Sequence, residues 1–269
     1  MRRAKIIGFI SIKGGVGKTT VVSNLGYILA KDFKKKVLVV DGNFSGPNLG
    51  LHLGLTNPQN TLHNVLSGNL QLQKAIHEHM SGLHLLPSSI FGKKVDCSKF
   101  HQYVASLRGM YDLILIDSSP ALNQEMLATI MASDELFVVT TPDNVTLEST
   151  IDSIKIAKQK RTYLSGIIIN KMRGKKFELS LEAIQDATKV PVVSVLENDG
   201  KVMSALAKGK PISSYFARNN LSVEYKKLAA ALIGDRYLDN RLKTKLKNLF
   251  TKKLDQDEIN RAIVMVSHY

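Results

Sequence analysis

Residues 11–20 read SIKGGVGKTT, and this stretch decides the fold because it joins a buried strand to a helix. The residues before it, KIIGFIS at 5–11, form an apolar run typical of a strand. After the glycines, apolar residues recur at the spacing of one helix face. A glycine-rich loop between a strand and a helix can turn its backbone N–H groups towards phosphate oxygens. The stretch therefore predicts a phosphate-binding loop.

The residue types in the loop predict a nucleotide site that uses ATP and Mg²⁺. Lys18 is expected to reach the β- and γ-phosphates, Thr19 to place its hydroxyl on Mg²⁺, and Thr20 to bond the α-phosphate. The loop backbone that surrounds the phosphates is formed by Gly14, Gly15, Val16 and Gly17. One lysine is enough for this task, so the second one, Lys13, needs another explanation.

Six more apolar runs alternate with amphipathic segments along the chain. The runs are rich in Val, Ile and Leu and scarcely alternate with polar residues, as expected for strands buried on both faces; they cover 36–41, 83–87, 111–117, 135–141, 165–170 and 191–196. Helical periodicity follows the loop and recurs at 145–160 and 221–233, whereas 42–70 is expected to be irregular. The pattern predicts an α/β fold, doubly wound, with a mostly parallel sheet flanked by helices.

The pattern changes after residue 235, which predicts two parts. Residues 1–235 are expected to form one α/β domain, and 236–269 a basic amphipathic helical extension. Within the extension, apolar residues of 236–254 form one stripe on a helix, and the segment carries seven basic residues and one acidic residue.

Composition limits the cellular setting. The chain has 269 residues, and its single cysteine, Cys97, cannot form an internal disulfide, which favours a reducing compartment. No run approaches the roughly 18 apolar residues of a transmembrane helix. The sequence therefore predicts a cytoplasmic protein, with peripheral attachment to the inner face of the cell membrane as the alternative. The net charge of +14 favours a nucleic acid, an anionic lipid surface or an acidic protein as partner.

The segment KGGVGKTT at 13–20 resembles the deviant Walker A motif of the MinD/ParA family of P-loop ATPases. The resemblance covers about residues 1–235 and implies an ATP-dependent homodimer. In that family the early lysine crosses the dimer interface and contacts the phosphates bound by the other subunit. The resemblance assigns this role to Lys13, where an added cation would neutralise charge on the transferred phosphoryl group.

Other landmarks of the family recur in order. YDLILIDSSP at 111–120 places Asp117 at a strand end, similar to the Walker B aspartate that holds Mg²⁺, and Asp41 is available near the same ion. The run GIIIN ends in Asn170, which matches the asparagine that bonds adenine. The region 190–212 resembles the family's base-side loop, which implies base contacts from Glu197 and Asp199.

One departure affects the chemistry. The family usually has Asp-x-Asp after the second strand, whereas this chain has Asp41-Gly42-Asn43. Asn43 can orient the attacking water by hydrogen bonding but cannot accept its proton. Phosphoryl transfer depends mainly on positioning, so the sequence predicts slow or partner-stimulated ATP hydrolysis. The alternative, that Asn43 is a turn residue whose identity is unimportant, stays open.

Two functional branches follow from the resemblance. A MinD-like protein would act as a nucleotide-switched regulator of cell division or of the position of cellular components, bound to anionic membrane through 236–254. A ParA-like protein would bind non-specific DNA through its basic surface and partition chromosomes or plasmids. The segment 236–254 favours the first branch, with an unidentified activator or cargo protein as partner. Packing of this segment on residues 1–235, or binding to a partner protein, remains open, and the tail after it either extends the apolar surface or folds back.

Overall fold

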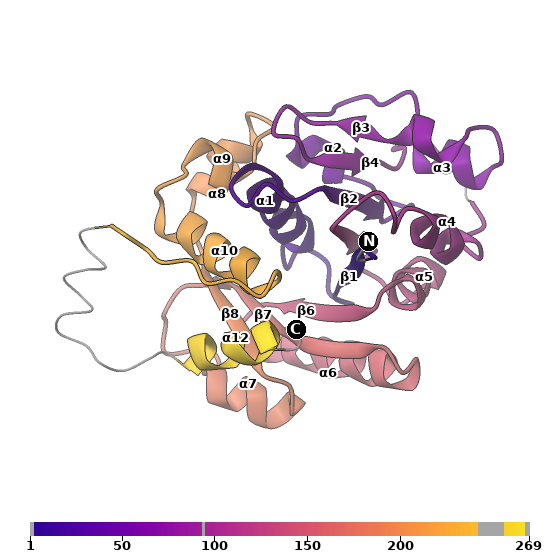
Figure 1. Ribbon diagram of the computed structural model, residues 1–269. Helices are drawn as coiled ribbons and strands as arrows, with labels where there is room; N and C mark the ends of the chain where they lie inside the picture. Colours follow the sequence, from indigo (N-terminus) through magenta and orange to yellow (C-terminus); the bar gives the residue numbers. More distant parts are fainter. Residues whose placement is uncertain (1–2, 93–94, 242–255, 267–269) are drawn as a thin grey trace.

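The structure is a computed structural model that describes residues 3–92, 95–241 and 256–266. Within these ranges, eight strands form one sheet in the order β3-β4-β2-β5-β1-β6-β7-β8 (Figure 1). All neighbouring strands are parallel except β3, which pairs antiparallel with β4. The strands are β1 (Lys5–Ile10), β2 (Val37–Gly42), β3 (His77–Glu78), β4 (His84–Leu86), β5 (Leu113–Ser118), β6 (Glu135–Thr140), β7 (Tyr163–Met172) and β8 (Val192–Glu197).

Helices connect the strands and cover both faces of the sheet (Figure 1). The longer ones are α1 (Lys18–Lys31), α4 (Phe100–Ser106), α5 (Gln124–Ala132), α6 (Asn144–Gln159), α7 (Leu181–Thr188), α10 (Asn220–Ala231) and α12 (Gln256–Val266). The shorter ones are α2 (Leu49–His52), α3 (Leu62–Leu66), the 3₁₀ turn η1 (Leu72–Ala75), α8 (Lys201–Leu206) and α9 (Ile212–Tyr215).

The doubly wound α/β fold is confirmed. Each of the seven predicted apolar runs overlaps a strand, and helices occupy the three segments of helical periodicity. The two-residue strand β3 was not predicted, because so short a strand has no periodicity to detect. The region 42–70 is less irregular than expected, since it contains α2 and α3; Thr61 and Asn64 form a reciprocal capping box at the start of α3.

Alternate residues of the strands enter cores on opposite faces. Ile7 and Phe9 pack in a cluster with residues of α1 and α10, whereas Ile6 packs with residues of α4 and α5. A third cluster joins the β6–β7 side of the sheet to α6 and α7. The central strands are therefore buried on both faces, which explains why their sequences hardly alternate.

The chain returns to the sheet after residue 235. Residues 236–241 are irregular rather than the start of a helix; within them, the backbone N–H of Arg241 bonds the carboxylate of Asp239, a local bond that competes with helix formation. The rest of the helix expected over 236–254 lies outside the described residues. The boundary proposed at residue 235 stays a prediction.

Helix α12 belongs to the extension and packs against β8 and α10. Asn260 Nδ2 donates to the carbonyl of Val192 at 2.8 Å, and Arg261 Nε donates to the carbonyl of Val193 at 2.9 Å. Because β8 is the last strand of the sheet, these side chains satisfy acceptors on an otherwise open edge. The described part of the tail therefore folds back. No helix among the described residues has the length and apolarity needed to cross a membrane.

Candidate functional site

The glycine loop lies between β1 and α1, at the carboxyl end of the central strand. Strands β5 and β6 lie on the two sides of β1, so the loop stands where the sheet's winding reverses. Ligands of open α/β sheets bind at such a crevice. Gly15 and Gly17 have φ values of 79° and 96°, which favour glycine. Helix α1 begins after Gly17 with no side-chain cap, so its first N–H groups can bind an anion.

Lys18 is buried at the base of this loop. Its Nζ donates to the carbonyl of Ser11 at 3.4 Å. Burial lowers the pKa of Lys18, and the nearby charge of Asp117 opposes that effect. A lysine held between the loop and a buried carboxylate is positioned to bind a phosphate tail.

Two buried carboxylates lie side by side on neighbouring strands, and the charge of one of them, Asp117, acts on Lys18. Asp41 on β2 and Asp117 on β5 are Cα partners in the parallel register. Burial, and then the charge of Asp117, raise the pKa of Asp41 to about 8, although backbone N–H groups of residues 43, 48 and 49 oppose the shift. Burial also raises the pKa of Asp117 to about 6, against the Thr19 hydrogen bond and the charge of Lys18. Two carboxylates so placed favour a bound cation.

The oxygen atoms present fit Mg²⁺. The hydroxyl of Thr19 donates to Oδ2 of Asp117 at 2.6 Å, which brings the loop and the end of β5 together. Among the described residues, Oδ1 of Asp117 is buried and has no hydrogen-bond partner. Buried polar atoms are almost always satisfied, so this unpaired carboxylate oxygen fits the role of a metal ligand. Hard oxygen ligands of this kind are the ones that Mg²⁺ prefers.

The loop after β2 holds Asn43 beside Asp41. Asn43 is buried; its Nδ2 donates to the carbonyl of Gly46 at 2.6 Å and its backbone N–H donates to Asp41 at 3.2 Å. One of its two amide N–H groups is engaged in the loop, and the Oδ1 of Asn43 remains an acceptor for water. A Cβ on Gly42 would lie 2.9 Å from the carbonyl oxygen of Asp117, so the close approach of β2 and β5 requires glycine there.

A second contact joins this loop to the segment after β5. Ser45 donates from its backbone N–H and from its hydroxyl to the two carboxylate oxygens of Glu125, in the first turn of α5. The loops that follow Asp41 and Asp117 are therefore linked directly. Because Ser45 and Glu125 are 80 positions apart in the sequence, no local pattern could have predicted their contact.

Asn170 lies against the glycine loop. Its Nδ2 donates to the carbonyl of Val16 at 2.8 Å, and its Oδ1 accepts from the backbone N–H of Lys171 at 2.9 Å. Lys171, near the end of β7, donates from Nζ to the carbonyl of Gly15 at 2.6 Å. Both side chains thus contact the loop itself, and the adenine contact of Asn170 stays a prediction.

Glu197 and Asp199 lie at the next strand end. Glu197 is exposed and is the Cα partner of Met172, two residues beyond Asn170. Asp199 accepts from Lys201 N–H and from Asn219 Nδ2, both at 2.8 Å. These residues flank the Asn170 side of the site without any described contact to the glycine loop, so their role in base binding also stays a prediction.

Lys13 is exposed at the rim of the loop, unlike Lys18. Burial raises the pKa of Asp143, yet its hydrogen bonds from Thr141 and Thr146 and the charge of Lys13 lower it below the usual value. Lys13 therefore lies near the N-terminus of α6, which Asp143 caps. Of the remaining predicted residues, Gly14 lies beside Pro120 and Thr20 is in the first turn of α1, and their contacts with phosphate stay predictions.

Comparisons with known proteins agree with this geometry. A family model described as an AAA domain matches residues 4–165, more than half of the chain. An uncharacterized ATP-binding protein of Methanocaldococcus jannaschii is 32% identical over 249 residues, covering 91% of this chain and 94% of that protein. The septum site-determining protein MinD of Synechocystis is 30% identical over 217 residues, covering 77% and 81%. The solved structure of MinD from Pyrococcus horikoshii, complexed with Mg-ADP, has a TM-score of 0.81 at 30% identity and covers 93% of this chain and 100% of that chain.

The fold and the loop thus define a P-loop ATPase domain. Within that class, the chain belongs to the MinD/ParA family, in its MinD-like branch.

The position of Gly17 provides a direct test of the site. A Cβ at this position would collide with Nδ2 of Asn170, and the φ of 96° is unfavourable for alanine. We expect Gly17→Ala to weaken the binding of a fluorescent ATP analogue at least about tenfold, equivalent to ~1.4 kcal/mol. Gly109→Ala is the matched control, since a Cβ there has open space around it. Equal affinities of the two variants would contradict the described packing of Asn170 on the loop.

Proposed function

We propose that this protein binds Mg-ATP at the glycine loop, dimerises in that state, hydrolyses ATP slowly and acts as a MinD-like spatial regulator. The observation that carries the proposal is the cluster of Lys18, Thr19 and Asp117 beside the uncapped start of α1. The fold, the loop and the oxygen ligands are consistent with ATP and Mg²⁺ as cofactors.

The residues around the loop have distinct tasks in this proposal. Thr19 and Asp117 hold the metal ion, and Asp41 lies next to Asp117 on the neighbouring strand. The metal ion neutralises phosphate charge when bound. Lys18 and the loop N–H groups bind the β- and γ-phosphates. Asn170 supports the loop and extends towards the base, and the loop with Glu197 and Asp199 forms the outer side of the base site.

Dimerisation is supported by the surface around Lys13. Lys13 itself is exposed, and large apolar side chains are exposed on segments that follow β5, β6 and β7: Leu122 (55%), Val145 (67%) and Phe177 (75%). Because the carboxyl ends of parallel strands lie on one edge of the sheet, these residues belong to one side of the molecule. An exposed cation and exposed apolar side chains on one side of the molecule suit contact with a second copy whose phosphates Lys13 binds.

Slow hydrolysis is supported by the loop after β2. Asn43 occupies the place of the water-orienting aspartate and lacks a group that accepts a proton. One of its two amide N–H groups donates to the carbonyl of Gly46, and its Oδ1 can accept a hydrogen bond from water and so position it. The Ser45–Glu125 contact links this loop to the segment after Asp117, so a partner that shifts either segment would alter the position of Asn43.

The two lysines separate nucleotide binding from dimerisation. We expect Lys13→Ala to bind ATP with near wild-type affinity but to stay monomeric with Mg-ATP, and to lose at least about tenfold in turnover, as when a single transition-state cation is removed. Lys18→Ala is expected to lose tight binding itself. Mass measurement by light scattering with ATP and with ADP, beside nucleotide titration, distinguishes the cases. An Mg-ATP dimer of Lys13→Ala with full turnover would contradict the proposal.

Attachment to membrane is the second element of the proposal. The segment 236–254 contains seven basic residues and one acidic residue, so it is suited to anionic headgroups. Each basic residue contributes ~1 kcal/mol to binding near such a surface. A dimer presents two copies, so avidity would make attachment depend on ATP.

Co-sedimentation tests this element. We expect the full chain to sediment with anionic liposomes in ATP more than in ADP, and a variant in which the seven basic residues of 236–254 are replaced by glutamine to remain in solution. Non-specific duplex DNA is the parallel arm. Binding to DNA in ATP that survives the glutamine variant, with no binding to liposomes, would support the ParA-like alternative instead.

A further inference from the structure

Lys171 has a backbone conformation that is unusual for a lysine inside a strand. It lies within β7, and its φ of 58° is in the left-handed region that favours glycine. The pairing of β7 with β8 is irregular at this point: the pair before it is Ile169–Val195, and the pair after it is Met172–Glu197. Strand β7 thus has one residue more than β8 between these pairs, which is the pattern of a β-bulge. Bulges often redirect a side chain next to a functional site.

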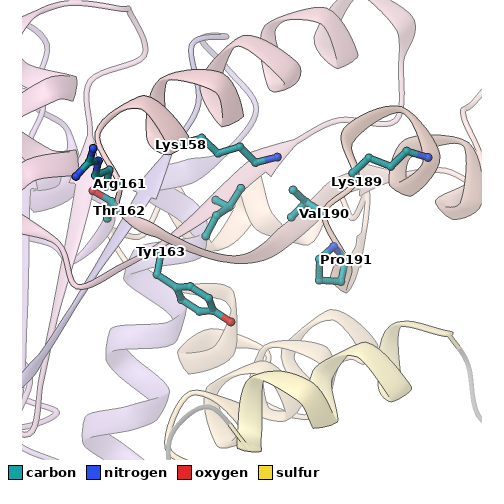
Figure 2. Close-up of a pocket in the computed structure, with 8 residues that line it drawn as sticks. Lys158, Arg161, Thr162, Tyr163, Lys189, Val190 and Pro191 are labelled. Carbon is teal, nitrogen blue, oxygen red and sulfur yellow. The ribbon is translucent and has the colours of Figure 1, made fainter.

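The other non-glycine residues with a positive φ, within the described part of the chain, follow helix ends. They are Lys34 after α1, Arg161 after α6 and Lys189 after α7, and left-handed residues are common at such positions. Figure 2 shows the side chains of Arg161 and Lys189 directed apart at opposite sides of a surface hollow. Among the described residues, none of these three side chains bonds to another strand, helix or loop. Lys171 differs from them because its side chain does.

Lys171 and the residue before it both reach the glycine loop. Lys171 Nζ donates to the carbonyl of Gly15 at 2.6 Å, and Asn170 Nδ2 donates to the carbonyl of Val16 at 2.8 Å. Consecutive residues of a regular strand point to opposite faces of the sheet, so two neighbours cannot normally contact the same loop. The left-handed turn at Lys171 removes this alternation. The bulge therefore allows two adjacent side chains to hold two consecutive carbonyls.

These two contacts fix the direction of two N–H groups in the loop. In a planar trans peptide the C=O and the following N–H point in opposite directions, and none of the described peptide bonds is cis. Holding the carbonyl of Gly15 therefore directs the N–H of Val16 away from Lys171. Holding the carbonyl of Val16 directs the N–H of Gly17 away from Asn170 in the same way. Glycine-rich backbone has many other conformations available, so these contacts limit a segment that would otherwise be free to rotate.

We infer that Lys171 is a positioning residue of the nucleotide site, which orders the glycine loop so that the N–H of Val16 faces the phosphates. The inference rests on the proposed binding of Mg-ATP at this loop. A loop that is ordered before binding loses less conformational freedom when the ligand arrives. Because Lys171 acts on the phosphate-binding backbone, it strengthens the binding of any ligand with a phosphate chain, with or without a base.

Titration with a fluorescent ADP analogue and Mg²⁺ tests this role on the full chain, because ADP keeps the proposed ATP-dependent dimer out of the measurement. We expect Lys171→Gly to bind the analogue roughly fivefold more weakly than the wild type, as for the loss of one hydrogen bond. Its melting temperature without nucleotide should not fall, because glycine relieves the left-handed φ. Lys171→Arg keeps a long cationic donor at this position and should retain the wild-type affinity.

Lys34→Gly is the matched control, since Lys34 is also an exposed lysine, with a φ of 55°, and follows α1. Its affinity for the analogue should equal that of the wild type. Displacement of the analogue by Mg-pyrophosphate separates an ordered loop from a direct contact with the nucleoside. We expect Lys171→Gly to weaken pyrophosphate binding by the same factor as nucleotide binding, because both ligands use the N–H groups of the loop.

Five results would overturn the inference and leave the proposed function intact. Lys171→Gly could keep its nucleotide affinity, melt at a lower temperature than the wild type, or bind pyrophosphate normally while it loses nucleotide. Lys34→Gly could weaken binding equally, or Lys171→Arg could lose as much affinity as Lys171→Gly. Absence of nucleotide binding by the wild type would overturn both the inference and the proposed function.

Discussion

The pairing of Asp41 and Asp117 on neighbouring strands is the constraint on which the site depends. Two carboxylates are buried side by side in the sheet, and the raised pKa values, about 8 and about 6, reflect burial and, for Asp41, the charge of its neighbour. Such a pair is costly unless protons or cations compensate it. Lys18 and the hydroxyl of Thr19 interact with Asp117 of this pair, so the interaction that stabilises this carboxylate also positions the phosphate-binding loop.

Contacts between loops then make the site one unit. Ser45 and Glu125 join the segments after the two aspartates, while Asn170 and Lys171 hold the carbonyls of the glycine loop from the other side. The loops that follow β1, β2 and β5 are thus each bonded to a neighbouring segment. A change at the nucleotide would be transmitted through these bonds to the apolar surface beside Lys13, which is where the proposed second copy would bind.

The sequence predicted the central strands well because they are buried on both faces and keep a continuous apolar character, as in VLVV before Asp41. The sequence also predicted the positions of the glycine loop and of both aspartates, because the end of each apolar run marks the end of a strand. It did not reveal Ser45–Glu125 or Lys171–Gly15, since pairs 80 and 156 residues apart leave no periodic signal. The docking of α12 was equally hidden, because Asn260 and Arg261 bond backbone carbonyls of β8 rather than complementary side chains. The roles of Lys13, Glu197 and Asp199 rest on the family resemblance and stay predictions.

The central claim is that this site holds Mg-ATP better than it hydrolyses it, because an asparagine stands where a carboxylate would orient and deprotonate water. The most direct measurement is the steady-state ATPase rate and ATP affinity of Asn43→Asp beside the wild type. The account predicts that Asn43→Asp turns over ATP at least about tenfold faster than the wild type, a gain no larger than general-base catalysis can supply. Its ATP affinity should stay within about twofold of the wild type. An unchanged turnover at unchanged affinity would contradict it and would make Asn43 a turn residue of no catalytic consequence.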